Sequence, residues 1–392
     1  MHLLPTRLIP SPCDSHSTSS QSRNKFVETA LAYALSYVSS LSRSKIGPAS
    51  ITILADTDYY SHAGSTSNAS PRWTDQRFLD FNVPLAKAHK TGLGSSAALV
   101  TAFTAAVFAH YIDPEGAFLK SGVGRARLHN LAQAAHCAAQ GKVGSGFDVA
   151  AAVHGSCVYK RFSPSILEGL ADTGTEGFST RLKAVVEGTD SSNQWDTQIQ
   201  KSSAIMPEGL RLVMCDVDCG SATVGMVKKV LSWRKESHKE AALLWRTLQK
   251  GNEDLVGELQ RLCRATGESR YDYDDLSTII ETIRSLIREM SMKAGVPIEP
   301  KVQTELLDAC CQVPGVVGGV VPGAGGYDAI ALLVDERKSE VFNGLHGLLD
   351  HYTVDAEEVE GASIGKVRLL SVKQEMEGVK MMNPTKYEHW TK

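Results

Sequence analysis

Long hydrophobic runs are missing from this chain of 392 residues. The longest, such as residues 329–334, fall far short of the roughly 20 apolar residues that a helix needs to cross a bilayer. Charge of one sign is not in excess either, because 41 basic and 44 acidic side chains leave a formal net charge of −3. The composition therefore excludes a membrane-spanning helix and a general attraction to nucleic acid or anionic membranes, and any anion must be bound locally.

Cysteine is sparse, and its spacing completes no zinc site. The eight cysteines lie singly apart from two close pairs, and neither pair has a second pair or a histidine set beside it. This pattern is typical of reduced thiols in a cytosolic protein, so we expect a cytoplasmic location. Prolines at positions 5, 10 and 12 disfavour the amphipathic helix of a transit peptide. We expect residues 1–23 to form a disordered leader.

Apolar periodicity predicts a mixed fold. Helices and strands are intermixed without the recurring strand–helix–strand units of a wound parallel sheet, so the pattern alone predicts an α+β protein, and the length suggests two domains. Predicted helices cover residues 26–41, 95–111, 125–140, 222–235, 236–250, 254–266 and 276–294. Predicted strands cover residues 50–54, 78–83, 156–162, 210–217, 318–321, 329–334 and 367–371. Residues 163–204 are expected to be mostly loops.

The most informative stretch is residues 90–98, which read Lys-Thr-Gly-Leu-Gly-Ser-Ser-Ala-Ala. Gly92 and Gly94 let the backbone approach a ligand closely, and Ser95 and Ser96 stand at the first free N–H groups of the following helix. The positive end of the helix dipole then faces a bound anion. Because the lysine precedes the glycines, this is not a Walker A loop. The stretch predicts a phosphate cradle, and an ordinary capped helix after a glycine turn is the alternative.

Two further glycine-rich segments favour the cradle. Residues 141–152 place Asp148 directly after a run with three glycines, where its carboxylate can accept a proton from a hydroxyl or orient a nucleophile. An aspartate that caps a helix beginning at Val149 is the alternative. Residues 321–334 run from a glycine turn into an apolar strand, for which the alternative is a tight loop before a buried strand.

These three segments resemble motifs of the GHMP kinases. Residues 92–98, 144–148 and 322–331 are similar to the second motif, the catalytic-aspartate segment and the third motif of that superfamily. More narrowly, residues 129–142 and the short runs at 298–300 and 302–304 resemble the fungal-type phosphomevalonate kinases. The likeness extends from about Asn24 to the C-terminus and is strongest between Lys90 and Gly155.

The resemblance implies an α+β fold of two domains with the active site between them. The implied first domain, over residues 24–205, is like domain 2 of ribosomal protein S5 and binds ATP. The implied second domain, over residues 206–392, is ferredoxin-like. The expected partners are small molecules, and we expect no nucleic acid, no membrane and no obligate protein partner.

The activity that the resemblance implies is phosphoryl transfer from ATP to 5-phosphomevalonate, which gives 5-diphosphomevalonate in isoprenoid and sterol synthesis. Such a transfer depends mainly on positioning and on the neutralisation of charge. Mg²⁺ is the expected second cofactor, with the hydroxyl of Ser96 as a ligand. The expected ATP-binding residues are Lys90, Gly92, Leu93, Gly94, Ser95, Ser96 and Ala97.

Asp148 stands at the position of the family's catalytic aspartate, and Lys142 is a second catalytic candidate. The acceptor phosphate is already largely ionised at neutral pH, so we expect Asp148 to orient substrate and metal rather than to abstract a proton. Two alternatives stay open: His136 is a core histidine instead of a phosphate or water contact, and Arg284 and Arg288 line a solvated helix face instead of clamping a phosphate. The expected substrate-binding residues are His136, Ser145, Gly146, Ser221, Thr223, Arg284, Arg288, Gly323, Ala324, Gly325 and Gly326.

One departure from the family pattern bears on activity. Family members open with a strand that carries a Pro-Gly-Lys motif and a following Gly-Gly-Tyr turn, and no segment of this sequence matches that opening. We therefore expect the first domain to lack its opening strands, which puts the activity of this chain in question. Two other functions stay open: a related kinase that acts on mevalonate or a sugar, and a non-catalytic remnant that binds nucleotide or a partner through the cradle.

Overall fold

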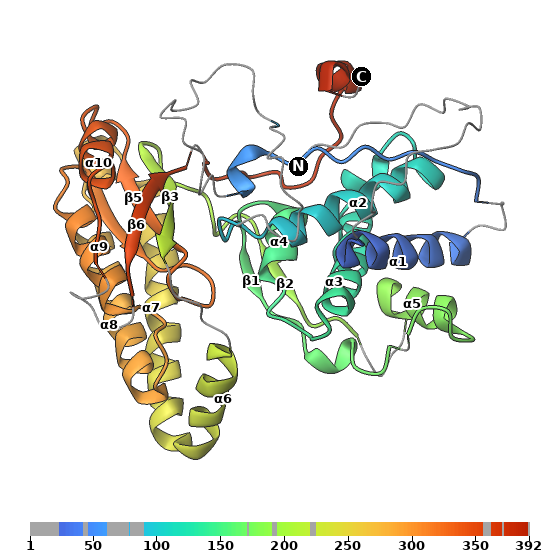
Figure 1. The fold of residues 1–392 in the computed structure, drawn as a ribbon, viewed down its shortest axis with the longest axis horizontal. Coiled ribbons are helices and arrows are strands. Elements are labelled where there is room, and N and C mark those ends of the chain that lie inside the picture. Colours follow the sequence, from blue (N-terminus) through green and yellow to red (C-terminus); the bar gives the residue numbers. More distant parts are fainter. Residues whose placement is uncertain are drawn as a thin grey trace.

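The structure, a computed structural model, describes residues 23–41, 46–60, 78, 90–170, 172–189, 194–219, 225–355, 362–370 and 372–390. The expected leader lies outside these residues, apart from Arg23 at its end. Of the strand expected over residues 78–83, only Phe78 is described. The described elements form two groups, one mostly helical and one built around a sheet (Figure 1).

Helices dominate the first group, on the right of Figure 1. Helix α2 is apolar all round, and its many alanines let α1 and α3 pack closely against it, as expected of a buried helix. The largest side chains of this core include Tyr37, Leu131, Phe162 and Leu182. The elements are α1 (Lys25–Leu41), α2 (Ser95–Tyr111), α3 (Gly122–Gln140), α4 (Phe147–His154), α5 (Phe178–Glu187) and the antiparallel pair β1 (Val158–Lys160) and β2 (Gln198–Gln200).

A four-stranded antiparallel sheet organises the second group, in the order β4-β5-β3-β6. Along the chain the order is strand, helices, strand, strand, helix, strand, which is the split βαβ arrangement of ferredoxin-like folds. The strands are β3 (Leu210–Cys219), β4 (Val316–Val320), β5 (Ala329–Asp335) and β6 (Ile364–Leu369). The helices are α6 (Met226–Glu236), α7 (His238–Arg264), α8 (Asp274–Ala294), α9 (Lys301–Cys311) and α10 (Val341–Leu349). The expected α+β fold is confirmed.

Both faces of this sheet are covered, which explains why β5 is apolar at every position up to Val334. Ile330, Leu332 and Val334 join a cluster with α9 and α10. The intervening Leu333 packs with side chains of α7 and α8 in a second cluster. Successive residues of a strand point to opposite faces, so a strand buried on both faces reads as a continuous hydrophobic run.

The chain crosses back to the first group after β6, as Figure 1 shows for the red segment beside α4. Ser156 N–H donates to the carbonyl of Glu375 over 2.7 Å, and Val379 N–H donates to the carbonyl of Ala152 over 2.8 Å. Val379 is part of the first core. Residues 372–381 thus pack on the first half and connect the two halves, although the expected second domain, over residues 206–392, includes them.

Three expected elements differ from the structure. Residues 50–54 form no strand with any described residue, and Ile51 and Ile53 are each more than a third exposed. The two helices expected over 236–250 and 254–266 are one helix, α7, because Gly251 packs on Ile283 of α8 instead of ending the helix. Within residues 163–204, α5 and β2 are regular elements that were not expected.

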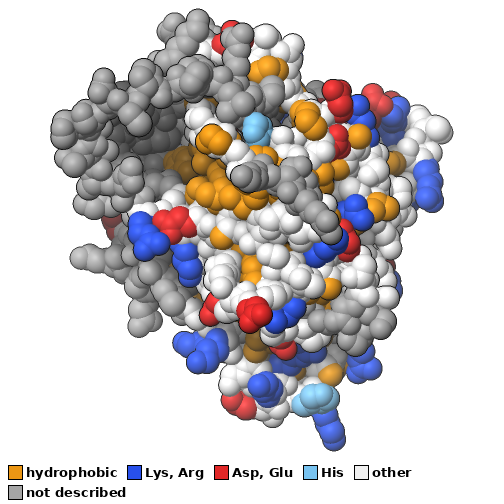
Figure 2. Space-filling model, turned by 90° about the vertical axis from the view of Figure 1, so that its right-hand side faces the viewer, with side chains coloured by type: hydrophobic (Ala, Val, Ile, Leu, Met, Phe, Trp, Pro, Cys, Tyr) orange, Lys and Arg blue, Asp and Glu red, His pale blue; other side chains and the backbone are white. Residues whose placement is uncertain are grey.

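An apolar groove opens where residues 46–51 lie beside α1 and α2. Figure 2 shows hydrophobic side chains gathered on that end of the molecule. The lining side chains include Leu35, Ile46, Ile51, Phe103 and Tyr111. None of the described helices combines the length and the apolar character that crossing a bilayer requires.

Candidate active site

The glycine turn before α2 has the geometry of an anion cradle. Gly92 and Gly94 have φ of 73° and 68°, and Gly94 caps the helix without a side-chain hydrogen bond, which leaves the first amides of α2 available. The hydroxyl of Thr91, which is buried, donates to the carbonyl of Asp58 over 2.7 Å and anchors the turn from below. Ala97, in the first turn of α2, is fully buried.

A second helix N-terminus meets this cradle. Helix α4 begins at Phe147, and Asp148 lies in its first turn with 23% of its side chain exposed. The preceding Gly146 has φ of 77°, and a Cβ there would lie 2.7 Å from the amide nitrogen of Gln133, so the turn needs glycine. A Cβ on Gly94 would lie 3.5 Å from the Cβ of Asp148. Both helix dipoles therefore favour an anion at the same place.

His136 joins the two helix ends from beneath. Its Nε2 lies 3.1 Å from the Ser96 hydroxyl, 3.9 Å from Oδ2 of Asp148 and 3.4 Å from the Gln140 amide nitrogen. Burial lowers the pKa of His136, although the nearby Asp148 carboxylate acts in the opposite direction. The imidazole is only 3% exposed, and its Nε2 faces protein groups. This geometry favours the core alternative, in which His136 contacts Ser96 and Asp148, over the expected phosphate contact.

A buried polar layer holds the turn before Asp148. The Gln133 amide donates to the carbonyl of Gly146 over 2.6 Å and lies 3.2 Å from Nε2 of His129. Nδ1 of His129 lies 3.3 Å from the side-chain oxygen of Asn130, so these partners assign the hydrogen to Nδ1. The ring centroids of His129 and His154 are 5.4 Å apart. Burial lowers the pKa of His129 to about 4.

The third glycine segment faces the cradle from the second half of the chain. Gly323 and Ala324 are exposed at the tip of this loop, and Gly326 is buried at its base. Where β5 begins, the Cβ of Ala329 lies 3.9 Å from the position of a Cβ on Gly92. The C-terminal end of the third glycine-rich segment therefore lies beside the turn that holds Gly92.

The expected cations differ in their surroundings. Lys90 is exposed, and its Nζ lies 5.8 Å from the ring centroid of Phe26, which itself packs 5.6 Å from the ring of His136. Lys142 is exposed at the end of α3 and makes no ion pair with the described residues. Ser145 is exposed, and its carbonyl accepts a hydrogen bond from the Tyr159 hydroxyl. The expected substrate contacts Ser221 and Thr223 lie outside the described residues.

Arg284 and Arg288 are corrected, because neither guanidinium is available to a phosphate. Arg284 is 3% exposed and pairs with Glu299, Glu281 and Asp308. Arg288 pairs with Glu281 and Glu299 over 2.6 and 3.1 Å. Burial alone would lower the pKa of Arg284, but hydrogen bonds to Glu299 and Asp308 and the charge of Glu281 outweigh it and raise the pKa. The two arginines lie on one helix face, as their spacing predicts, but that face binds carboxylates of the protein itself.

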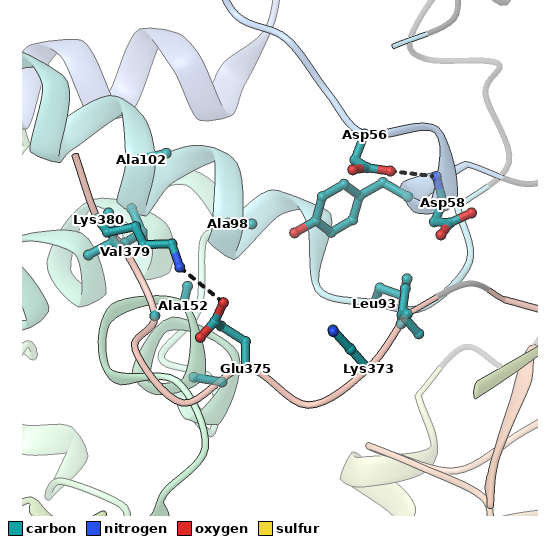
Figure 3. A pocket seen from close by; sticks show the side chains of 15 residues that line it. Asp56, Asp58, Leu93, Ala98, Ala102, Ala152, Lys373, Glu375, Val379 and Lys380 are labelled. Carbon is teal, nitrogen blue, oxygen red and sulfur yellow. Dashed lines mark hydrogen bonds and ion pairs between the residues drawn. The ribbon is translucent and has the colours of Figure 1, made fainter. Parts of the chain in front are cut away.

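A pocket of about 430 Å³ adjoins the cradle (Figure 3). Leu93 and Ala98 line it from the cradle side, and Lys373 points into it from the segment that follows β6. Lys380 lines the same pocket but is paired with Glu375 over 3.3 Å. Lys373 could not be predicted from the sequence, because its segment carries no motif and lies far along the chain from the glycine turn.

Comparison with known proteins identifies the family to which the chain belongs. The family described as GHMP kinases N terminal domain matches residues 76–156, which include the cradle and Asp148. A phosphomevalonate kinase of Aspergillus fumigatus is 52% identical over 371 residues, covering 94% of this chain and 75% of that protein. A phosphomevalonate kinase of Gibberella zeae is 47% identical, covering 94% and 78%. The chain belongs to the phosphomevalonate kinase family.

A more distant relative agrees with this assignment, and a solved structure shares the fold. A relative from Arabidopsis thaliana named phosphomevalonate kinase, peroxisomal, is 33% identical and covers 80% of this chain and 73% of its own length. Among solved structures, a Lin0012 protein from Listeria innocua has a TM-score of 0.54 at 18% identity, covering 93% of this chain and 84% of its own. The likeness to the Listeria protein shows a shared fold and nothing more. The resemblance read from the three glycine-rich segments is confirmed.

Proposed function

We propose that this chain transfers the γ-phosphoryl group of ATP to the phosphate of 5-phosphomevalonate and releases ADP and 5-diphosphomevalonate. The observation that carries the proposal is the meeting of Ser96, His136 and Asp148 where the N-termini of α2 and α4 converge. Family membership at 52% identity supports the choice of substrate. A bond forms between an oxygen of the acceptor phosphate and the γ-phosphorus, and the bond from that phosphorus to the bridging oxygen of ATP breaks.

The chain's own groups mainly position and neutralise charge. We assign the amides of residues 92–97 to the ATP phosphates, in the field of the α2 dipole. Asp148 orients the acceptor, whose phosphate needs no general base because it is already largely ionised at neutral pH. Lys90 and Lys142, both exposed beside the two helix ends, supply positive charge to the phosphates.

Mg²⁺ fits the oxygen donors of this site. Ser96 and Asp148 lie on either helix end beside His136 Nε2, at 3.1 and 3.9 Å, and we assign their oxygens to the ion. Such an ion usually takes one or two carboxylates together with substrate phosphates and water, and no cluster of three metal-binding side chains is found among the described residues. When bound, Mg²⁺ would neutralise charge on the transferred phosphoryl group.

Specificity for the phosphorylated acceptor tests the proposal. With ATP and Mg²⁺ present, we expect strong preference for 5-phosphomevalonate over mevalonate at matched concentrations, because mevalonate would leave the lysines without their anion. Replacing Lys142 by Met should raise KM for 5-phosphomevalonate by about tenfold. The matched control is Lys120→Met, at an exposed lysine outside the site. Comparable rates on both acceptors, or a preference for mevalonate or a sugar, would favour another kinase of the superfamily.

The location of the reaction in the cell stays a prediction. All seven cysteines within the described residues are free thiols, in keeping with the reduced state on which the cytoplasmic expectation rests. The Arabidopsis relative is named as peroxisomal, so localisation of a tagged full chain decides between the cytoplasm and the peroxisome.

A further inference from the structure

A buried carboxylate lies behind the third glycine loop. The side chain of Glu299 is 1% exposed, and its Oε1 accepts hydrogen bonds from Arg284 over 2.8 Å, from Arg288 over 3.1 Å and from the Thr304 hydroxyl over 3.1 Å. A carboxylate this deep is tolerated only when it is paired and hydrogen-bonded. Glu299 lies between α8 and α9 and belongs to neither helix. Its hydrogen bonds and ion pairs therefore fix the irregular segment that precedes α9.

The backbone beside Glu299 carries the loop. Gly326 N–H donates to the carbonyl of Ile298 over 2.9 Å. Gly325 has φ of 82°, and a Cβ there would lie 2.3 Å from the same carbonyl, so the loop rests directly on Ile298. From the other side, the Gln303 amide donates to the carbonyl of Tyr327 over 2.5 Å. The loop is thus held by Ile298, in the segment that Glu299 anchors, and by Gln303 in the first turn of α9.

The same contacts reach the cradle of the first half. The loop leads into β5 at Ala329, whose Cβ meets the Gly92 turn. A shift of residues 298–303 would therefore move the third glycine loop relative to the cradle. Positioning errors of this kind are costly in phosphoryl transfer, where the reacting groups must be held in line.

We propose that Glu299 is a positioning residue: clamped by Arg284 and Arg288, it sets the third glycine loop against the acceptor substrate. The inference rests on the proposed function, because it assigns that loop to 5-phosphomevalonate. Glu299 itself lies behind the loop and touches no reacting group.

The test compares two buried carboxylates in the same half of the chain. Glu299→Gln keeps the shape but leaves two guanidinium groups with less compensating charge. We expect KM for 5-phosphomevalonate to rise by about tenfold or more, while KM for ATP changes by less than about twofold. The control is Asp335→Asn, which breaks a pair with Arg337 at the far end of β5 and should lower the melting temperature without changing either KM.

Kinetics are measured below the melting temperature of each variant, so that a merely structural role predicts unchanged KM values for both. Equal acceptor KM in Glu299→Gln and wild type would overturn the inference. If Glu299→Gln does not fold, Thr304→Val removes a single hydrogen bond to the same oxygen and should raise the acceptor KM by a smaller factor, and an unchanged KM in that variant also overturns the inference. A wild-type chain that does not phosphorylate 5-phosphomevalonate refutes the proposed function instead.

Discussion

Replacing Asp148 by Asn is expected to lower kcat by roughly two to four orders of magnitude while ATP binds almost as tightly as in the wild type. The carboxylate lies where the N-termini of α2 and α4 converge, and its side chain is partly exposed there. Asparagine keeps the shape and the hydrogen bond that Oδ1 accepts from Val149 N–H. The change therefore removes the charge that orients substrate and metal, and little else.

Two measurements separate catalysis from folding in this variant. Steady-state ADP release gives kcat, and calorimetric titration with a non-hydrolysable ATP analogue gives nucleotide affinity. The melting temperature should stay close to that of the wild type, because an acid in the first turn of a helix contributes only about 0.3–1 kcal/mol. The control is Asp196→Asn, at a carboxylate that accepts hydrogen bonds from Ser163 in the same half. Near-normal turnover would remove Asp148 from the active site.

Motifs with a local physical meaning were predictable from the sequence. The glycine turn before α2 and the carboxylate after Gly146 follow from local rules on helix ends, and α2 begins and ends at the predicted residues. The sequence could not show that Ser96, His136 and Asp148 meet, because that depends on how α2, α3 and α4 pack. The family resemblance supplied the expectation that these segments share one site.

The spacing of two arginines wrongly predicted a phosphate clamp, because their partners in the folded protein cannot be recognised from the sequence. Arg284 and Arg288 lie one turn apart, which fits a phosphate clamp equally well as an internal ion-pair cluster. Glu299, which decides between the two, belongs to a segment with no helical or strand periodicity. Burial of that carboxylate depends on contacts between residues distant in sequence, which a single sequence does not reveal. Lys373 was missed for the same reason.

Helix and strand boundaries show a similar limit. The sequence predicts two helices on either side of residues 251–253, but the lack of a side chain at Gly251 lets α7 approach Ile283 closely, so packing outweighs the low helix propensity of glycine. Residues 50–54 have the apolar alternation of a strand, yet among the described residues no partner strand pairs with them. A strand needs a neighbour, and propensity alone does not supply one.

Acid is expected to unfold the first half of this protein between about pH 6.5 and pH 4. Burial lowers the pKa of His129 to about 4, and burial together with the charges of His129, Arg125 and Lys201 lowers that of His154 to about 3. Both values lie below the ordinary histidine pKa near 6.5, so the unfolded chain takes up protons first. Stability is therefore complete above pH 6.5 and falls as the pH drops towards the two folded-state values.

The loss of unfolding free energy should be large, because each unit of pKa shift corresponds to about 1.4 kcal/mol and two buried histidines contribute. It should amount to several kcal/mol, which is a large part of an ordinary domain's stability. It should also reach the active site. Nε2 of His129 faces the Gln133 amide, which holds the carbonyl of Gly146. A protonated ring presents N–H to N–H there, which weakens the support of the turn that carries Asp148.

Urea unfolding at several pH values between 7 and 4 measures the effect, with turnover followed in parallel after return to neutral pH. His154→Phe removes one of the two titrating rings and should flatten the fall in unfolding free energy by about half. His238→Gln, at an exposed histidine that begins α7, should leave the slope unchanged. If His154→Phe and the wild type lose stability with the same slope, His154 does not contribute to the acid sensitivity, and the two-histidine account is wrong.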